Sequence, residues 1–121
     1  MKSKTIPIIL VLLISSIALM AEPLKLNESS NPQPVGGMKT LKKNTSYPSF
    51  AALEHIESDV VLNIIVDKRG EISDISVVQS GGYLFDNSAI AAVLKTTWTP
   101  ALQGDSPVEV TYELPFEFRI K

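Results

Sequence analysis

The sequence contains no cysteine, a single histidine and few aromatic residues, which make up 7% of its 121 residues. Without thiols the chain forms no disulfides, so its core must be held by burial of apolar side chains, and cysteine-based catalysis is excluded. The sequence also lacks a metal-ligand cluster and a glycine-rich phosphate loop before a helix. We therefore expect no enzyme activity, no cofactor and no metal ion.

The balance of charge limits the class of partner. The chain has 11 basic and 13 acidic residues, and removal of Lys2 and Lys4 with the N-terminal segment would leave nine against 13, a net charge of −4. Proteins that bind nucleic acid present an excess of basic residues. We expect no nucleic acid partner.

Residues 1–21 have the pattern of a targeting segment. Lys2 and Lys4 form a basic start, an apolar stretch follows from Ile6 to Ile14, and small residues come after it. The alternative is an N-terminal membrane anchor, because the uncharged run of residues 5–21 approaches the roughly 17 residues that a spanning helix needs. A cleaved signal peptide and an anchor both predict that the rest of the chain is exported.

Residues 22–45 are polar and contain several prolines, which predicts a flexible linker. Within it, Gly36-Gly37 precedes a short amphipathic turn, and Met38 and Leu41 would dock that turn on the domain that follows. We expect this domain to occupy residues 46–121.

The first half of the domain predicts a short helix and a hairpin. Pro48 suits the first turn of a helix that runs to Glu54, and His55 would end it in the left-handed conformation. Residues 60–66 alternate as a strand with one apolar face. The turn Asp67-Lys68-Arg69-Gly70 has an acceptor first and glycine fourth, which is typical of a type I turn. The return strand, residues 72–78, changes parity after Ile72, which predicts a bulge.

The second half predicts a longer helix and a closing strand. Asp86 would cap a helix from Asn87 to about residue 97, and Trp98 at its exit would fill the gap between helix and sheet. From Val108 onward apolar and polar residues alternate, interrupted only by Pro115. The predicted fold is α+β: a small antiparallel three-stranded sheet covered on one face by an amphipathic helix, with a short N-terminal helix.

Several segments together resemble the C-terminal domain family of the energy transducer TonB, over most of residues 34–121. The ordered set of short matches with near-constant spacing carries the resemblance. The matching segments are PVGGM (34–38), YP (47–48), IES (56–58), VDKRGEI (66–72), S and GG (80–82), WTPA (98–101) and PVEVTYELPFEF (107–118). Ser58, where the family usually has glycine, and Thr96-Thr97 depart from the family pattern.

The resemblance implies a periplasmic domain that recognises a short extended segment, the TonB box, of outer-membrane transporters. It also implies an inner-membrane complex of the ExbB/ExbD type as a partner if the chain is anchored. If the closing strand pairs with residues 60–66 on one side, its other side is free for an added strand. The expected contact residues are Val108, Glu109, Val110, Thr111, Tyr112, Glu113 and Leu114, with Tyr47 and Pro48 as a flank and with Trp98, Pro115, Gly70 and Asp86 in structural roles.

Other interpretations remain open. The closing strand is equally well explained as an ordinary outer strand whose charges prevent aggregation. The linker is short beside the proline-rich spacer of the family, which favours an adaptor that uses the same edge on another periplasmic protein without energy coupling. A homodimer formed through exposed edges is a further alternative. The chain would be soluble in the periplasm if residues 1–21 are cleaved and anchored in the inner membrane if they are not.

Overall fold

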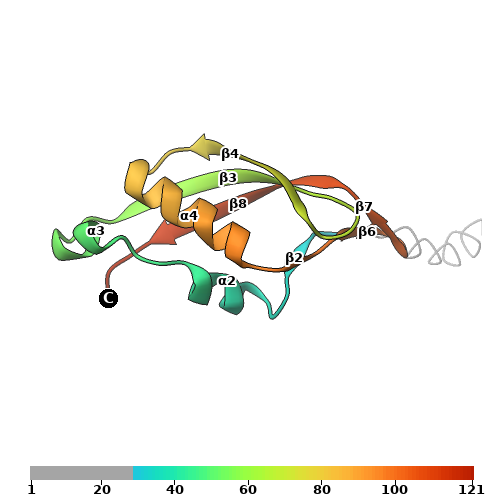
Figure 1. The fold of residues 1–121 in the computed structure, drawn as a ribbon, viewed down its shortest axis with the longest axis horizontal. Coiled ribbons are helices and arrows are strands. Elements are labelled where there is room, and N and C mark those ends of the chain that lie inside the picture. The colour runs from blue at the N-terminus through green and yellow to red at the C-terminus, as the bar shows by residue number, and fades with distance from the viewer. Residues whose placement is uncertain (1–28) are drawn as a thin grey trace, which may run out of the picture.

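The computed structural model describes residues 29–121, so the expected signal peptide or anchor lies outside the described residues. Figure 1 shows an elongated molecule in which a long helix lies across a sheet. None of the helices in this part of the chain has the length and apolar character needed to cross a bilayer. The elements in chain order are β1 (Ser29–Ser30), β2 (Gln33–Pro34), α2 (Met38–Asn44), α3 (Ser49–Leu53), β3 (Ser58–Val66), β4 (Ile72–Gln79), α4 (Tyr83–Lys95), β5 (Trp98–Thr99), β6 (Ala101–Gln103), β7 (Ser106–Val108) and β8 (Val110–Phe118).

The main sheet has three antiparallel strands in the order β4-β3-β8, and α4 packs on one of its faces (Figure 1). This arrangement confirms the predicted α+β fold. The central strand β3 alternates as its sequence requires, because Val60, Leu62, Ile64 and Val66 all have 0% of their surface exposed. Each such side chain contributes about 1.5–3 kcal/mol by leaving water, so this apolar row is a major source of stability.

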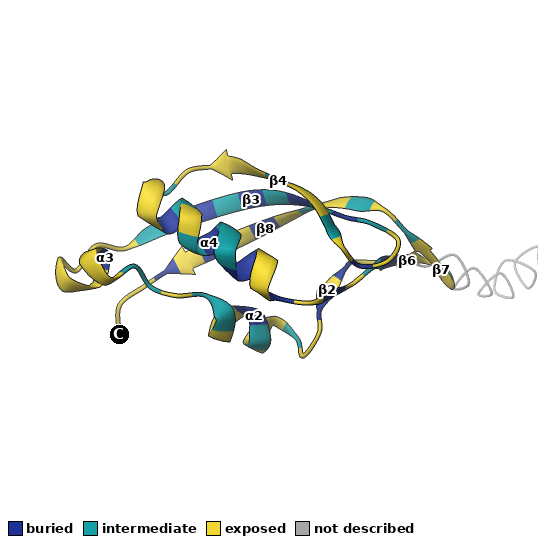
Figure 2. Cartoon of the chain, viewed as in Figure 1, coloured by how far each residue is buried: buried dark blue, intermediate teal, exposed yellow. Residues whose placement is uncertain are grey.

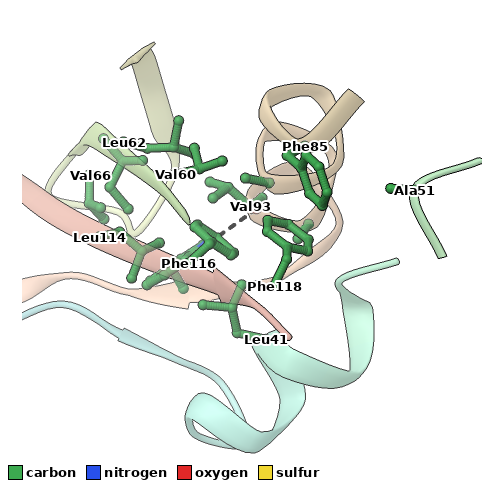
Figure 3. Close-up of a cluster of buried hydrophobic side chains, with 14 residues drawn as sticks. Leu41, Ala51, Val60, Leu62, Val66, Phe85, Val93, Leu114, Phe116 and Phe118 are labelled. Carbon is green, nitrogen blue, oxygen red and sulfur yellow. Dashed lines mark hydrogen bonds between the residues drawn. The ribbon is translucent and has the colours of Figure 1, made fainter. Parts of the chain in front are cut away.

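The core lies between the sheet and the helices, and Figure 2 shows buried residues gathered along β3, β8 and the inner side of α4. Phe85 on α4 lies 5.0 Å from Phe118 on β8, ring centre to ring centre. Leu41 of α2 closes the cluster from the side of β8 (Figure 3). Three elements that are far apart in the sequence therefore share one apolar interior.

The hairpin between β3 and β4 has the predicted turn. Gly70 N–H donates to the Asp67 carbonyl at 2.9 Å, and the Asp67 carboxylate accepts the N–H groups of Arg69 and Glu71 at 2.9 Å each. Gly70 has a φ of 84°, which favours glycine. Ile65 pairs with Asp74 but Val66 pairs with Ile72, so Ser73 is the extra residue of the predicted bulge.

The short helix α3 ends as the sequence predicts. His55 has a φ of 56° and is the only non-glycine residue with positive φ among residues 29–121. The Ile56 N–H donates to Ala51 O at 2.8 Å and the His55 N–H to Ala52 O at 3.3 Å, which together form a Schellman motif. Pro48 stands one position earlier than expected, because it caps the helix rather than lying in its first turn.

The prediction for the start of the long helix was wrong. α4 begins at Tyr83, four residues before Asn87, and Gly82 rather than Asp86 occupies the cap position. Asp86 lies in the first turn and reaches back, where its carboxylate accepts the Gly81 N–H at 2.8 Å and the Ser80 hydroxyl. Asp86 therefore still stabilises the helix start, as a negative charge near the positive end of the helix dipole.

Trp98 is buried at 4% exposure and belongs to the core cluster, which confirms its predicted position between helix and sheet. Its indole Nε1–H donates to the Val93 carbonyl at 3.2 Å. Trp98 also pairs through β5 with Pro34 of β2. The two paired strands β1 and β2 lie in residues that were expected to be linker, whereas the docked helix α2 stands where a docked turn was expected.

The predicted closing strand is divided in two. Val108 belongs to β7 and pairs with Ala101 in a hairpin, β6–β7, that the sequence analysis did not foresee. Glu109 follows between the strands, and β8 begins at Val110. Since β1 pairs with β6, this hairpin and Ser29–Ser30 form a small second sheet, at the end of the molecule opposite α3 (Figure 1).

Candidate functional site

The free flank of β8 is the candidate site. β8 pairs with β3 through nine consecutive residue pairs, from Ser58↔Phe118 to Val66↔Val110, with no shift of register. β8 is the outer strand of the sheet, and no strand of residues 29–121 pairs with its other side. A regular outer strand of this kind presents a row of N–H and C=O groups to a further strand.

Pro115 indicates which backbone groups point outward. In an antiparallel ladder, alternate residues direct their N–H and C=O groups to the same neighbour. Pro115 pairs with Val61 in the middle of the unbroken ladder, although it has no N–H to donate. We infer that its nitrogen faces away from β3. Residues of the same parity, Thr111 and Glu113 among them, then turn their N–H groups to the free flank.

The side chains of β8 divide between two environments. Leu114, Phe116 and Phe118 face α4 and are buried, and Tyr112 on the same side is half-buried against the core. The opposite face carries exposed polar and charged residues around Pro115; these are Thr111, Glu113 and Glu117. The expected residues Val110 to Leu114 thus lie on one strand, whereas Val108 and Glu109 precede it.

Two hollows lie along this flank. The first, of about 360 Å³, is lined by four consecutive residues of β8, 115–118, and by residues of α2. The second, of about 270 Å³, is lined by residues 110–112, by residues of β1 and β6, and by Asn31, which follows β1. Consecutive residues of a strand point to opposite faces. A hollow that touches all of them therefore lies beside the strand, where an added strand would run.

The outer walls of the two hollows come from different elements. Met38, Leu41 and Lys42 of α2 and its C-cap residue Thr45 form the first. The wall opposite residues 110–112 consists of Ser29, Ser30, Asn31, Ala101, Leu102, Gln103 and Val108. The sequence predicted a docked turn with Met38 and Leu41 but did not assign it to the binding site. The wall from β1 and β6 was missed, because residues 22–45 were otherwise taken as linker.

The expected flanking residues Tyr47 and Pro48 line neither hollow. Tyr47 packs edge-on between Phe85 and Phe118, with 5.8 Å between ring centres in each case. Its hydroxyl donates to the Ile56 carbonyl at 2.5 Å. Burial raises the pKa of Tyr47, and the negative charge of Glu57 adds to this, while Arg119 opposes it. Tyr47 is thus a packed aromatic residue at the C-terminal end of β8.

The opposite edge of the sheet is less regular. β4 pairs with β3 through two register shifts, one that leaves Ser73 unpaired and one that leaves Val78 unpaired. Bulges of this kind twist a strand and interrupt the alignment of its outer N–H and C=O groups. Of the two outer strands of this sheet, β8 is the one with a continuous ladder.

A metal site would need several His, Asp or Glu side chains close together. The single histidine, His55, is exposed at the end of α3 and serves the helix terminus. Between residues 29 and 121 no three His, Asp or Glu side chains come together as a metal ion would require.

Comparison with known proteins adds a family and a fold. The family model described as Gram-negative bacterial TonB protein C-terminal matches residues 43–120. A search of curated protein sequences found no match.

Two solved structures are similar to this chain. The solution structure of the TonB C-terminal domain of Pseudomonas aeruginosa has 28% identity and a TM-score of 0.55, over 64% of this chain and 79% of that one. The C-terminal domain of Helicobacter pylori TonB, residues 179–285, has 19% identity and a TM-score of 0.53, over 69% of this chain and 77% of that one. The second likeness concerns the fold alone.

Proposed function

Because the chain belongs to the TonB C-terminal domain family, we propose that it acts in the periplasm as a peptide-binding module in energy-coupled transport. Its ligand is an extended segment, the TonB box, of an outer-membrane transporter, and this segment adds as a fourth strand to the free flank of β8. The contact residues in this proposal are Val108 to Leu114, and most of the contacts are made by Val110 to Leu114.

The observation that carries this proposal is the position of β8 in the sheet. On one side β8 pairs with β3 through nine consecutive residue pairs, and on its other side it pairs with no strand of residues 29–121. Strand addition takes its affinity from main-chain hydrogen bonds, so it requires a straight and continuous edge. β8 meets this requirement, whereas the two bulges of β4 do not. The outward N–H groups of Thr111 and Glu113 would be the central donors to the added strand.

A second candidate function is a periplasmic adaptor that uses the same flank without energy coupling. It is favoured by the small separation in sequence between residues 1–21 and β1. Because β1 includes Ser29, at most seven residues lie between them, and seven residues span at most about 25 Å. If residues 1–21 are retained as an anchor, a complex of the ExbB/ExbD type is the expected inner-membrane partner. If they are removed, the adaptor is the expected function.

A capture experiment with two variants at one position tests the binding mode. Glu113→Pro removes the outward N–H, and Glu113→Ala removes the same side chain but keeps the N–H. We expect wild type and Glu113→Ala to retain an outer-membrane transporter from a cell-envelope extract and Glu113→Pro to lose it. Equal recovery by a folded Glu113→Pro protein would overturn strand addition. The N-terminus of the mature protein distinguishes transducer from adaptor, because an intact Met1 supports the anchored form.

A further inference from the structure

The hollow between α2 and β8 is shaped to hold a side chain of the added strand. Four consecutive residues of β8, 115–118, form its inner wall, and Phe116 and Phe118 within this wall are buried in the core. The outer wall is α2, where Leu41 is 2% exposed and Met38 is 50% exposed. Most of this lining is apolar.

The position of α2 is fixed by hydrogen bonds near its C-terminal end. The Asn44 side-chain amide donates to the Thr96 hydroxyl at 2.9 Å, which ties the end of α2 to the end of α4. The Thr45 hydroxyl donates to the Leu41 carbonyl at 2.7 Å and holds the last turn closed. The outer wall of the hollow is therefore a preformed surface, and binding there does not require a loop to become ordered.

The volume of about 360 Å³ lies at the lower end of the range for ligand pockets. This space accommodates a short length of extended backbone with one large side chain, rather than a folded partner. Met38 is half-exposed at the wall, and methionine side chains adapt well to apolar surfaces of different shapes. The site thus favours an apolar side chain without requiring a particular one.

We propose that the hollow between α2 and β8 is the specificity pocket of the flank and that it selects an extended peptide with a bulky apolar residue near one end. That residue packs against Met38, Leu41 and Phe116, while the rest of the peptide runs along β8 towards residues 110–112. This inference rests on the proposed function, because it assumes that the peptide adds to β8. It makes α2 part of the binding site, although α2 lies outside the sheet.

Position-scanned peptides test the pocket. The probes are fluorescent nine-residue peptides of Thr and Lys in which a single Leu occupies each position in turn, measured by anisotropy against the full chain in mild detergent. We expect tighter binding when Leu stands near one end than when it stands elsewhere. Met38→Trp, which fills the hollow, should weaken the best peptide by about tenfold, the effect expected for one large apolar side chain kept out of the pocket.

Lys39→Trp is the matched control, because it places the same bulky residue on the same helix at a position that does not line the hollow. It should leave binding unchanged. If the position of Leu has no effect, or if Met38→Trp binds like wild type, the pocket is not used. The edge proposal survives that result provided that Glu113→Pro still abolishes binding. If Glu113→Pro binds as Glu113→Ala does, both proposals are overturned.

Discussion

Gly70 and the Trp98 carbonyl approach so closely that a Cβ atom on Gly70 would lie 2.4 Å from the Trp98 oxygen. Gly70 ends the turn between β3 and β4, and Trp98 follows α4, so this contact joins the hairpin to the segment after the helix. The turn residue is therefore fixed by tertiary packing as well as by its positive φ. The sequence indicated only the second reason.

Gly70→Ala should destabilise the protein by more than the conformational cost alone. Alanine at positive φ costs about 1–2 kcal/mol, and the contact with the Trp98 carbonyl adds to this because backbone must move. Gly104→Ala is the control, since Gly104 also has a positive φ, of 65°, and lies in the turn between β6 and β7. Denaturant unfolding of both variants measures the difference. Equal losses of stability would show that the close approach has no energetic effect.

Trp98→Ala should lower the free energy of unfolding by about 3–5 kcal/mol, because it leaves a cavity among core residues. Trp98→Phe keeps most of the apolar contact and should cost less. The Val93 carbonyl that loses the indole donor still accepts the Thr96 N–H at 3.3 Å, so it does not become unsatisfied. Unfolding followed by circular dichroism measures both variants. A Phe variant as unstable as the Ala variant would contradict this ranking.

The hairpin turn should contribute a pH-dependent part of the stability. The Glu71 N–H donates to the Asp67 carboxylate and lowers its pKa, desolvation opposes this, and Arg69 lowers it further. A carboxyl group whose pKa is lower in the folded state stabilises the protein above its unfolded pKa, near 3.8. That contribution is lost as the pH falls through the folded pKa.

Asp67→Asn keeps a side-chain acceptor but cannot ionise. We expect wild type to be more stable than this variant at neutral pH and the difference to shrink as the pH falls below about 4. Denaturant midpoints measured from pH 2 to 7 provide the test. Parallel profiles for the two proteins would show that the Asp67 charge has no role in the turn.

The acidic residues beside the flank of β8 should keep copies of the chain apart. Glu113 and Glu117 are exposed on the uncovered face of this strand, where a second copy would bring like charges together. Glu113→Val with Glu117→Val should therefore promote dimers at micromolar concentration, measured by sedimentation. Glu54→Val with Glu71→Val is the control, because both residues are exposed outside β8. Equal self-association of the two double variants would show that the flank is not responsible.

Local chemistry explains what the sequence predicted well. The alternation of β3, the Asp67–Gly70 turn and the left-handed His55 each depend on residues that are close in sequence, and each was found. The start of α4 was missed because Asp86 resembles a cap, whereas tertiary packing of Phe85 extends the helix back to Tyr83.

The candidate site also has a part that local sequence predicts and a part that depends on distant residues. The alternation of the closing strand and Pro115 indicated the edge, because a strand's own residues report on its two faces. The walls of the flank come from α2 and from β1 and β6, whose positions depend on pairings such as Ser29↔Gln103 and Pro34↔Trp98. Pairings between residues so far apart leave no periodic trace in one sequence.

The two-residue ladders at the N-terminal end of the fold have a mechanical consequence. Tension applied through the chain before Ser29 is carried first by the two pairs that join β1 to β6, and next by the two pairs that join β2 to β5. These short contacts resist a load far less than the nine-pair ladder of β3 with β8. A pull from the N-terminal side would thus peel away residues 29–34, up to the pairing of Pro34 with Trp98, while β8 keeps its shape.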